Sequence, residues 1–390
     1  MFRLGFHYHS NFTHINNQIK VPGYIGVFID SLAEQVDELV LFLEEQTDVN
    51  SKEEDYVLSR SNITLISLGD KSTFYHRLLK PREKVSIVLK HADKLDAFLL
   101  RAPSPLAPHL FKKLKTKVPI YPMLVGNYVK GLKDLQQPFI RKIAIIVLTY
   151  YYQWLHNNMV RSSNIFVNSG ELLEENKNLA KHITLVKTTT LSKESFYARE
   201  DTCQNSPIKL LFTGRINFQK GLRELVDAMS QLKSYPLELH IVGWEEKGIF
   251  SYVDALKQLA NEKGLGDKLF FHGKKQIGHE LNAYYKQADI YVIPSYHEGF
   301  PRTIWEALAH SLPVVATTVG SIPFYLKNRE QALLIPPQQV QPLVTALKEL
   351  ITNATLRQHL ITQGYEFTQE ITLDKQAQLL INQLKKYNLE

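Results

Sequence analysis

The stretch from Asp289 to Thr318 constrains the fold of this chain more than any other. It begins with a short, β-branched apolar run at Ile290–Pro294 and continues through a polar loop into a helical segment at Pro301–His310. A second apolar run, Pro313–Thr317, closes the unit. Strand, loop, helix and strand within about 30 residues predict a βαβ unit with parallel strands and a right-handed crossover. Because ligands of such sheets bind beyond the carboxyl ends of the strands, we expect a functional site in the first loop.

The rest of the chain alternates short apolar runs with helical patterns. This alternation predicts an α/β protein with mostly parallel sheets. The runs that we expect to form strands are Leu4–Tyr8, Leu39–Leu43, Ile63–Leu68, Ala97–Leu100, Ile120–Val125, Ile165–Asn168, Ile183–Val186, Leu210–Thr213, Leu237–Val242, Leu269–His272, Ile290–Pro294, Val314–Thr317 and Leu333–Pro336.

The length of 390 residues favours two domains over a single core. Around Leu191–Pro207 the sequence loses its apolar periodicity and becomes polar, so we place the domain boundary there. The prediction is a first domain over residues 1–190, a linker over 191–207 and a second domain over 208–372.

The composition limits the partners and the compartment. A net charge of +7 and a pI near 9.1 favour an anionic partner. Nucleic acid is not expected, because the chain has neither Cys/His zinc spacing nor an aromatic RNA-binding signature. The single cysteine, Cys203, excludes an internal disulfide framework and fits a reducing compartment. With no signal-peptide h-region and no apolar run long enough to span a bilayer, a cytoplasmic protein is expected.

Two stretches of the first half leave a membrane contact open. Basic residues cluster at Lys112–Lys117. They are explained either as a solvated helix end or as a patch that contacts an anionic bilayer. The apolar and aromatic stretch Pro138–Ser163 has basic ends. Its default interpretation is a core helix of the first domain, and the alternative is a helix that faces a membrane surface.

Glu298 and Glu306 gain meaning from their context. The chain has two other glutamate pairs at the same spacing, but only this one straddles a strand-to-helix turn. Taken alone, Glu298 is explained as an acidic residue at the start of a helix, where the helix dipole favours it, and Glu306 as a solvated helix residue. Upstream, "GRINFQKG" follows directly after an expected strand, so that Arg215 and Lys220 lie at its carboxyl end. A pyrophosphate leaving group needs such cations, because negative charge grows on it as a glycosidic bond breaks.

The segments "LLFTGRINFQKGLRELVDAM" and "EGFPRTIWEALAHSLPVVATTVGSIP" resemble the signature elements of retaining glycosyltransferases of family 4. The resemblance covers Lys209–Pro337 well, and the first half only in short segments such as "PGYIGVFIDSLAE". It implies the GT-B fold, an α/β architecture of two Rossmann-like domains facing each other across a cleft. It also implies a last helix, at about 373–390, that crosses back onto the first domain. The implied activity moves a hexose-type sugar, with retention, from a nucleotide sugar to a glycan or lipid-linked saccharide acceptor in cell-surface polysaccharide biosynthesis.

The resemblance also implies roles for individual residues. The catalytic residues would be Arg215, Lys220 and Glu298, with Glu306 on the ribose of the nucleotide. The donor-binding set would be Gly23, Gly214, Lys275, Gln276, Phe300, Pro301, Arg302, Thr303, Glu306, Gly320 and Ser321. The residue of the first domain that would contact the donor sugar is Arg101 by its position in the sequence, or His109 by its residue type. For Gly23 and its neighbour Gly26 the residues themselves leave two roles open, a close approach to a phosphate or a tight turn with close helix packing.

No metal or other cofactor is expected. The chain lacks an Asp-x-Asp pair to hold Mg²⁺ against a diphosphate, so the side-chain cations would take the place of the metal ion. The expected partners are a UDP- or GDP-sugar, the saccharide acceptor and, as a further candidate, an anionic membrane surface at the inner face of the cytoplasmic membrane. The departure at Pro323–Phe324, where the family commonly has Pro-Glu, leaves the donor sugar open. Two other functions also stay open, a non-hydrolysing nucleotide-sugar epimerase and a non-catalytic nucleotide-sugar-binding protein of the same fold.

Overall fold

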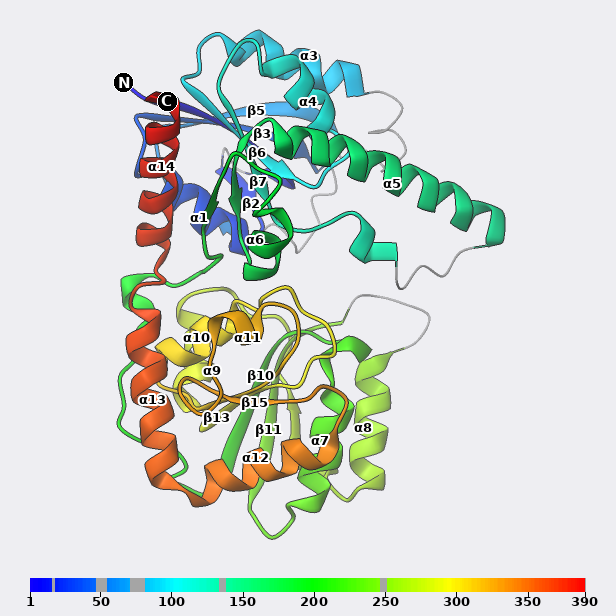
Figure 1. Ribbon diagram of the computed structural model, residues 1–390. Coiled ribbons are helices and arrows are strands. Elements are labelled where there is room, and N and C mark those ends of the chain that lie inside the picture. The colour runs from blue at the N-terminus through cyan, green and yellow to red at the C-terminus, as the bar shows by residue number, and fades with distance from the viewer. Residues whose placement is uncertain (16–17, 47–54, 71–80, 133–137, 246–250, 390) are drawn as a thin grey trace. The chain divides into compact units, whose positions relative to one another are not determined.

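The structure, a computed structural model, describes residues 1–15, 18–46, 55–70, 81–132, 138–245 and 251–389. The chain divides into two compact units (Figure 1). The first contains Met1–Thr188 and Leu373–Glu390, and the second contains Thr189–Thr372. Each unit has a parallel sheet with helices packed on it, as the alternating pattern of the sequence predicts.

The first unit is built on a parallel sheet in the order β5-β3-β1-β6-β7-β8-β9. Two short strands, β2 and β4, extend the far end of β1 in antiparallel pairing. The strands are β1 Arg3–Ile15, β2 Gln18–Val21, β3 Glu38–Glu45, β4 Tyr56–Val57, β5 Ile63–Asp70, β6 Ala97–Ala102, β7 Ile120–Leu124, β8 Asn164–Val167 and β9 His182–Leu185. The helices are α1 Gly23–Ala33, α3 Pro81–Ala92, α4 Ala107–Leu114, α5 Phe139–Arg161, α6 Gly170–Asn176 and α14 Leu373–Leu389.

The buried side chains of this sheet divide between its two faces. Along β3, Leu39, Leu41 and Leu43 join one core cluster, whereas Val40 and Phe42 join the other. This is the alternation that a strand covered on both faces requires. The first cluster also takes side chains from α1 and α14, and the second takes side chains from α3, α4 and the end of α5. The last helix of the chain thus completes the core of the first unit, and α14 packs beside α1.

Helix α5 departs from the default interpretation of a core helix. Only four of its side chains are buried, Tyr152, His156, Met159 and Val160, and all lie in its C-terminal half. From Phe139 to Tyr151 no side chain is buried. In Figure 1 the start of α5 extends beyond the other elements of the first unit. The default was wrong for this part because apolar content does not say whether anything covers the helix.

None of the helices among the residues that the structure describes combines the length and the apolar content needed to cross a bilayer.

The second unit has a fully parallel six-stranded sheet in the order β12-β11-β10-β13-β14-β15. Numbered within the unit, this order is the doubly wound pattern whose strand order reverses between β10 and β13. The strands are β10 Ile208–Arg215, β11 Leu237–Trp244, β12 Leu269–Phe271, β13 Ile290–Ile293, β14 Val314–Thr317 and β15 Leu333–Ile335. The helices are α7 Leu222–Gln231, α8 Tyr252–Glu262, α9 His279–Gln287, α10 Thr303–Ala309, α11 Ile322–Tyr325, α12 Val340–Thr352 and α13 Ala354–Thr368.

Each apolar run predicted as a strand is a strand, so the strand predictions are confirmed. The stretch 191–207, which we expected to form a linker, packs within the second unit. The guanidinium of Arg199 donates to the carbonyl oxygens of Ser311, Lys286 and Tyr285. The backbone N–H of Cys203 donates to Asp289 Oδ1 at 2.8 Å. Polar composition misled the prediction here, because it does not reveal the hydrogen bonds that attach this segment to the second unit.

Candidate active site

The loops after β10 and β13 meet at the point where the strand order of the second sheet reverses. In doubly wound sheets this is the place where ligands bind. Gly221 ends the first loop with φ +65°, and a Cβ there would lie 2.0 Å from the carbonyl oxygen of Pro294. Only glycine permits this approach, since an L side chain would collide with backbone. The N–H of Tyr296 donates to the carbonyl oxygen of Gln219 at 2.8 Å, which joins the two loops.

An ion pair between Lys220 and Glu298 bridges these loops. Lys220 Nζ donates to Glu298 Oε1 at 2.5 Å, and the side chains are only 18% and 11% exposed. The hydroxyl of Ser295 donates to the same carboxylate oxygen at 2.8 Å. The structure thus brings together two residues that the sequence placed separately, one as a phosphate contact and one as a sugar contact. Arg215, at the exposed carboxyl end of β10, adds a second cation to this edge of the sheet.

The loop after β14 closes against the same carboxylate loop. Gly320 has φ +54°, and a Cβ on it would lie 2.0 Å from the carbonyl oxygen of Glu298. The N–H of Ser321 donates to the carbonyl oxygen of Gly299 at 2.7 Å. The predicted donor-binding residues Gly320 and Ser321 therefore lie in contact with the backbone of Glu298 and Gly299.

Glu306 lies on α10 with a side chain only 7% exposed, inside a network of hydroxyl groups. Thr190 Oγ1 donates to Glu306 Oε1, and the hydroxyl of Tyr285 donates to Oε2 at 2.7 Å. Burial raises the pKa of the Tyr285 hydroxyl well above its ordinary value, and the Glu306 carboxylate acts in the same direction. The hydroxyl therefore stays protonated and remains a donor to the carboxylate.

The network continues toward the start of α10. Thr213 Oγ1 lies 2.7 Å from the hydroxyl of Tyr285 and 3.1 Å from that of Tyr291. The Tyr291 hydroxyl donates to Thr303 Oγ1 at 2.6 Å. Thr303, one of the predicted donor contacts, is thus positioned by a buried tyrosine of β13. Neither Thr190 nor Tyr285 was singled out from the sequence, and the Thr190 contact joins positions 116 residues apart that share no local pattern.

Phe300 serves the core as well as the loop. Its ring stacks on the buried Trp305 at 4.1 Å between ring centroids, and Tyr325 meets it edge-on. Pro301 and Arg302 lead from this anchor into α10, and the N–H of Ile304 donates to the carbonyl oxygen of Pro301 at 3.1 Å.

The predicted donor-binding residues Lys275 and Gln276 lie in the loop that follows β12, at the same carboxyl edge. The N–H of Gly243 donates to the carbonyl oxygen of Gly273 at 2.9 Å, which attaches this loop to the end of β11. Lys275 Nζ lies 3.0 Å from a carboxylate oxygen of Glu280, and the N–H of Gln276 donates to the other at 2.9 Å. Gly214, at the end of β10, pairs in register with Gly243. The loop residues and the glycines therefore share one edge of one sheet.

The predicted first-unit residues lie at the corresponding edge of their own sheet. The N–H of Gly23 donates to Asp55 Oδ1 at 2.7 Å, and a Cβ on Gly26 would lie 2.2 Å from the ring of Tyr56. Arg101 lies near the carboxyl end of β6, with its guanidinium 4.5 Å from the ring centroid of Tyr8. His109 lies on α4, where burial and the nearby Lys112 lower its pKa.

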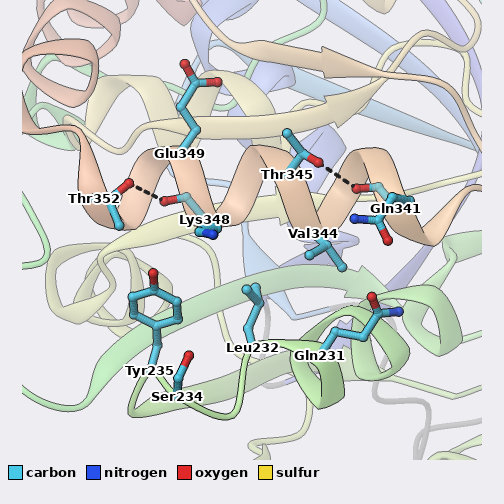
Figure 2. Close-up of a pocket in the computed structure, with 10 residues that line it drawn as sticks. All are labelled: Gln231, Leu232, Ser234, Tyr235, Gln341, Val344, Thr345, Lys348, Glu349 and Thr352. Atoms are coloured by element: carbon cyan, nitrogen blue, oxygen red, sulfur yellow. Dashed lines mark hydrogen bonds between the residues drawn. The ribbon is translucent and has the colours of Figure 1, made fainter.

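A groove on the second unit lies away from these loops (Figure 2). It runs between α12 and the turn that precedes β11, at the amino ends of the strands. Its lining residues are Gln231, Leu232, Ser234, Tyr235, Gln341, Val344, Thr345, Lys348, Glu349 and Thr352. The hydroxyls of Thr345 and Thr352 donate to carbonyl oxygens of their own helix, so they are not aimed at a ligand. The groove therefore adds nothing to the candidate site.

Comparison with known protein families finds a match in the second unit. Residues 195–367 match the family model described as glycosyl transferases group 1. The putative teichuronic acid biosynthesis glycosyltransferase TuaC of Bacillus subtilis is 28% identical over 195 residues, which are 48% of this chain and 46% of TuaC. The match spans about half or less of the length of the curated relatives. By sequence, the second unit is therefore similar to the glycosyl transferases of group 1.

Solved structures match both units. Sucrose-phosphate synthase from Thermosynechococcus elongatus aligns with a TM-score of 0.73 at 20% identity, over 100% of this chain and 99% of that one. Anabaena Alr3699/HepE, solved with UDP-glucose, aligns with a TM-score of 0.73 at 16% identity, over 99% of this chain and 100% of that one. The fold is GT-B. At these identities the likeness shows the fold alone, and the predicted architecture of two Rossmann-like domains is confirmed.

We predict that Tyr285→Phe lowers the free energy of unfolding of the second unit by about 1.5–3 kcal/mol, because a buried carboxylate loses a donor. Urea unfolding measures the change. Tyr235→Phe is the matched control, since its hydroxyl faces the groove of Figure 2 and should change stability by no more than about 0.5 kcal/mol. Equal stabilities of the two variants would show that Tyr285 does not hold Glu306.

Proposed function

We propose that this protein is a retaining, metal-independent glycosyltransferase of family 4. It moves a hexose-type sugar from a UDP- or GDP-sugar to a glycan or lipid-linked saccharide acceptor in the synthesis of a cell-surface polysaccharide. Its place of work is the cytoplasm, at the inner face of the cytoplasmic membrane. The family match over residues 195–367 supports the reaction class.

The observation that carries the proposal is the Lys220–Glu298 ion pair at the reversal point of the sheet. Arg215 and Lys220 offer two cations to a diphosphate there. A diphosphate that engages Lys220 replaces Glu298 as its partner, and the released carboxylate then accepts hydrogen bonds from the hydroxyls of the donor sugar. The pair therefore holds both side chains in place before the donor arrives, which lowers the reorganisation that binding requires.

The rest of the donor is assigned to the neighbouring loops. Glu306 receives the ribose hydroxyls, and the loop Gly273–Gln276 receives the base. Gly320 and Ser321 lie beside Glu298, and their loop is assigned to the sugar and phosphates. Anabaena Alr3699/HepE was solved with UDP and with UDP-glucose, which makes a uridine nucleotide the first donor to test.

The reaction assigned to this site needs no nucleophile from the protein. The acceptor hydroxyl oxygen forms a bond to the anomeric carbon on the face from which the phosphate oxygen leaves. The bond to that phosphate oxygen breaks, and its electron pair goes to the nucleoside diphosphate. The proton of the acceptor hydroxyl moves to the leaving phosphate, while Arg215 and Lys220 stabilise the growing negative charge.

The names of the relatives support a polysaccharide acceptor. Besides TuaC, similar proteins are a lipopolysaccharide core biosynthesis glycosyltransferase of Rhizobium meliloti and a putative colanic acid biosynthesis glycosyltransferase of Salmonella typhimurium. Each of these names refers to a bacterial surface polymer, so we infer an acceptor of the same chemical class.

We predict that Lys220→Met lowers turnover at saturating donor by about 10²- to 10³-fold, because it removes a cation that stabilises the leaving group. Initial rates of nucleotide release with a saccharide acceptor measure it. Lys263→Met is the matched control, since Lys263 also forms an ion pair in the second unit, with Asp227 at 2.9 Å. Its turnover should stay near that of the wild type.

The double variant Lys220→Met/Glu298→Gln separates a structural ion pair from a catalytic one. Lys220→Met alone leaves the buried Glu298 carboxylate unpaired, so its free energy of unfolding should fall. The double variant leaves no unpaired buried charge, so its free energy of unfolding should exceed that of Lys220→Met. It should nevertheless stay inactive. Turnover of Lys220→Met within a few-fold of wild type would contradict the phosphate role.

We further predict that activity survives a chelator, because side-chain cations neutralise the diphosphate. Rates measured with excess EDTA should match those measured without it. Loss of activity that Mg²⁺ or Mn²⁺ restores would contradict metal independence and would leave the donor site itself in place.

A further inference from the structure

The exposed apolar residues of the described chain are concentrated on α5. Seven of the seventeen exposed large hydrophobic side chains come from its residues 139–154. They are Phe139, Ile140, Ile143, Val147, Tyr150, Tyr151 and Trp154, with exposed fractions from 47% to 83%. At the rotation of about 100° per residue of an α-helix, these positions fall within about 120° of its circumference. They form one continuous stripe, called the α5 stripe below.

The stripe faces outward because the opposite side of α5 is the side that packs. Tyr152 and His156 of the C-terminal half contact Tyr128, with ring centroids 5.9 and 5.8 Å apart. Met159 and Val160 join the core cluster of α3 and α4. This anchor fixes the direction of the helix, and its N-terminal half extends beyond the other elements of the unit (Figure 1). The side chains of the stripe are exposed. An amphipathic helix normally turns such a stripe toward the core, so a partner outside the described chain is implied.

The charges on α5 identify the partner. The chain has no Asp or Glu between residues 135 and 170, whereas Arg141, Lys142 and Arg161 lie on the helix. Arg141 and Lys142 are exposed and fall outside the stripe, one on each side of it. Long basic side chains beside an apolar face reach lipid phosphates while the face itself meets acyl chains. A second copy of α5 would instead bring only positive charges together.

The aromatic residues agree with this partner. Tyr150, Tyr151 and Trp154 occupy the end of the stripe nearest the anchored half, and the rings of Tyr151 and Trp154 stack at 6.3 Å. Tyrosine and tryptophan are enriched at the boundary between lipid headgroups and acyl chains, because their rings are apolar and their polar tips stay hydrated.

We propose that α5 lies in the surface of an anionic lipid bilayer, with the α5 stripe in the acyl boundary and Arg141 and Lys142 at the headgroup phosphates. The inference deepens the proposed location at a membrane surface, and it does not depend on the proposed sugar transfer. It locates the contact on α5 rather than on the basic cluster Lys112–Lys117. In that cluster the lysines are exposed, and Lys117 pairs with Asp93 at 3.1 Å.

Flotation of the full chain with vesicles tests the proposal. Vesicles of phosphatidylcholine with phosphatidylglycerol should carry the protein upward at low salt, and vesicles of phosphatidylcholine alone should carry less of it. Ile143→Glu/Val147→Glu should weaken binding to the anionic vesicles at least about tenfold, because it places two anions in the stripe. Leu379→Glu is the matched control, since Leu379 is an exposed apolar residue of α14 in the same unit, 42% exposed. It should float like the wild type.

Tryptophan fluorescence gives a second readout at the stripe itself. Brominated phospholipids should quench part of the emission of the wild type and of Trp244→Phe, and this quenching should disappear in Trp154→Phe. Trp305 is buried in the second unit, and Trp244 also belongs to that unit. Quenching that persists in Trp154→Phe would overturn the proposal.

Three other results would also overturn it. In the first, the wild type stays at the bottom of the gradient with anionic vesicles. In the second, the Ile143→Glu/Val147→Glu variant floats like the wild type. In the third, the wild type sediments as a dimer and the same variant sediments as a monomer. Flotation that is lost only when Lys112, Lys113, Lys115 and Lys117 become Gln would place the contact on the lysine cluster instead. Titration of each variant with UDP reports the donor site separately, so a failure at the membrane leaves the proposed transfer intact.

Discussion

The ion pair between Lys220 and Glu298 is the interaction on which the candidate site depends. It joins two loops that leave neighbouring strands, and its side chains are largely withdrawn from water. A charge in such a place is costly unless it is paired, so each residue holds the other in position. Two glycines make the pair possible, because Gly221 and Gly320 bring backbone to within distances that no Cβ would allow. The proposed chemistry then follows from what a diphosphate does to this pair.

Glu306 depends on a second constraint of a different kind. Its carboxylate is buried and held by uncharged hydroxyls of Thr190 and Tyr285, with no cation among the hydrogen-bond partners that the structure describes for it. A carboxylate held in this way keeps its negative charge available to hydroxyl groups of a ligand, whereas an arginine partner would neutralise it. The same tyrosine connects to Thr213 on β10, so the network links Glu306 to the strand that carries Arg215.

The sequence predicts the strands well, because they follow from local patterns. Buried parallel strands are continuous apolar runs. Arg215 ends one of these strands, and Lys220 and Glu298 lie in the loops that follow β10 and β13. Contacts between distant positions have no such pattern. The bond of Lys220 to Glu298 and the bond of Thr190 to Glu306 both require the folded sheet, so the sequence placed the residues without their partners. The strands β2 and β4 were missed because they are only four and two residues long. For α5, the apolar pattern predicts the helix but not that half of it would stay uncovered.

The central claim is that a nucleotide binds at the carboxyl edge of the second sheet with its ribose on Glu306. Calorimetric titration of the wild type and of Glu306→Gln with UDP, and with GDP in parallel, tests this claim most directly. The account predicts binding of at least one of the two nucleotides to the wild type. Binding to Glu306→Gln should be weaker by about 1.5–3 kcal/mol, because the ribose hydroxyls lose a charged acceptor. Equal affinities of the two proteins, or no binding of either nucleotide to the wild type, would contradict it.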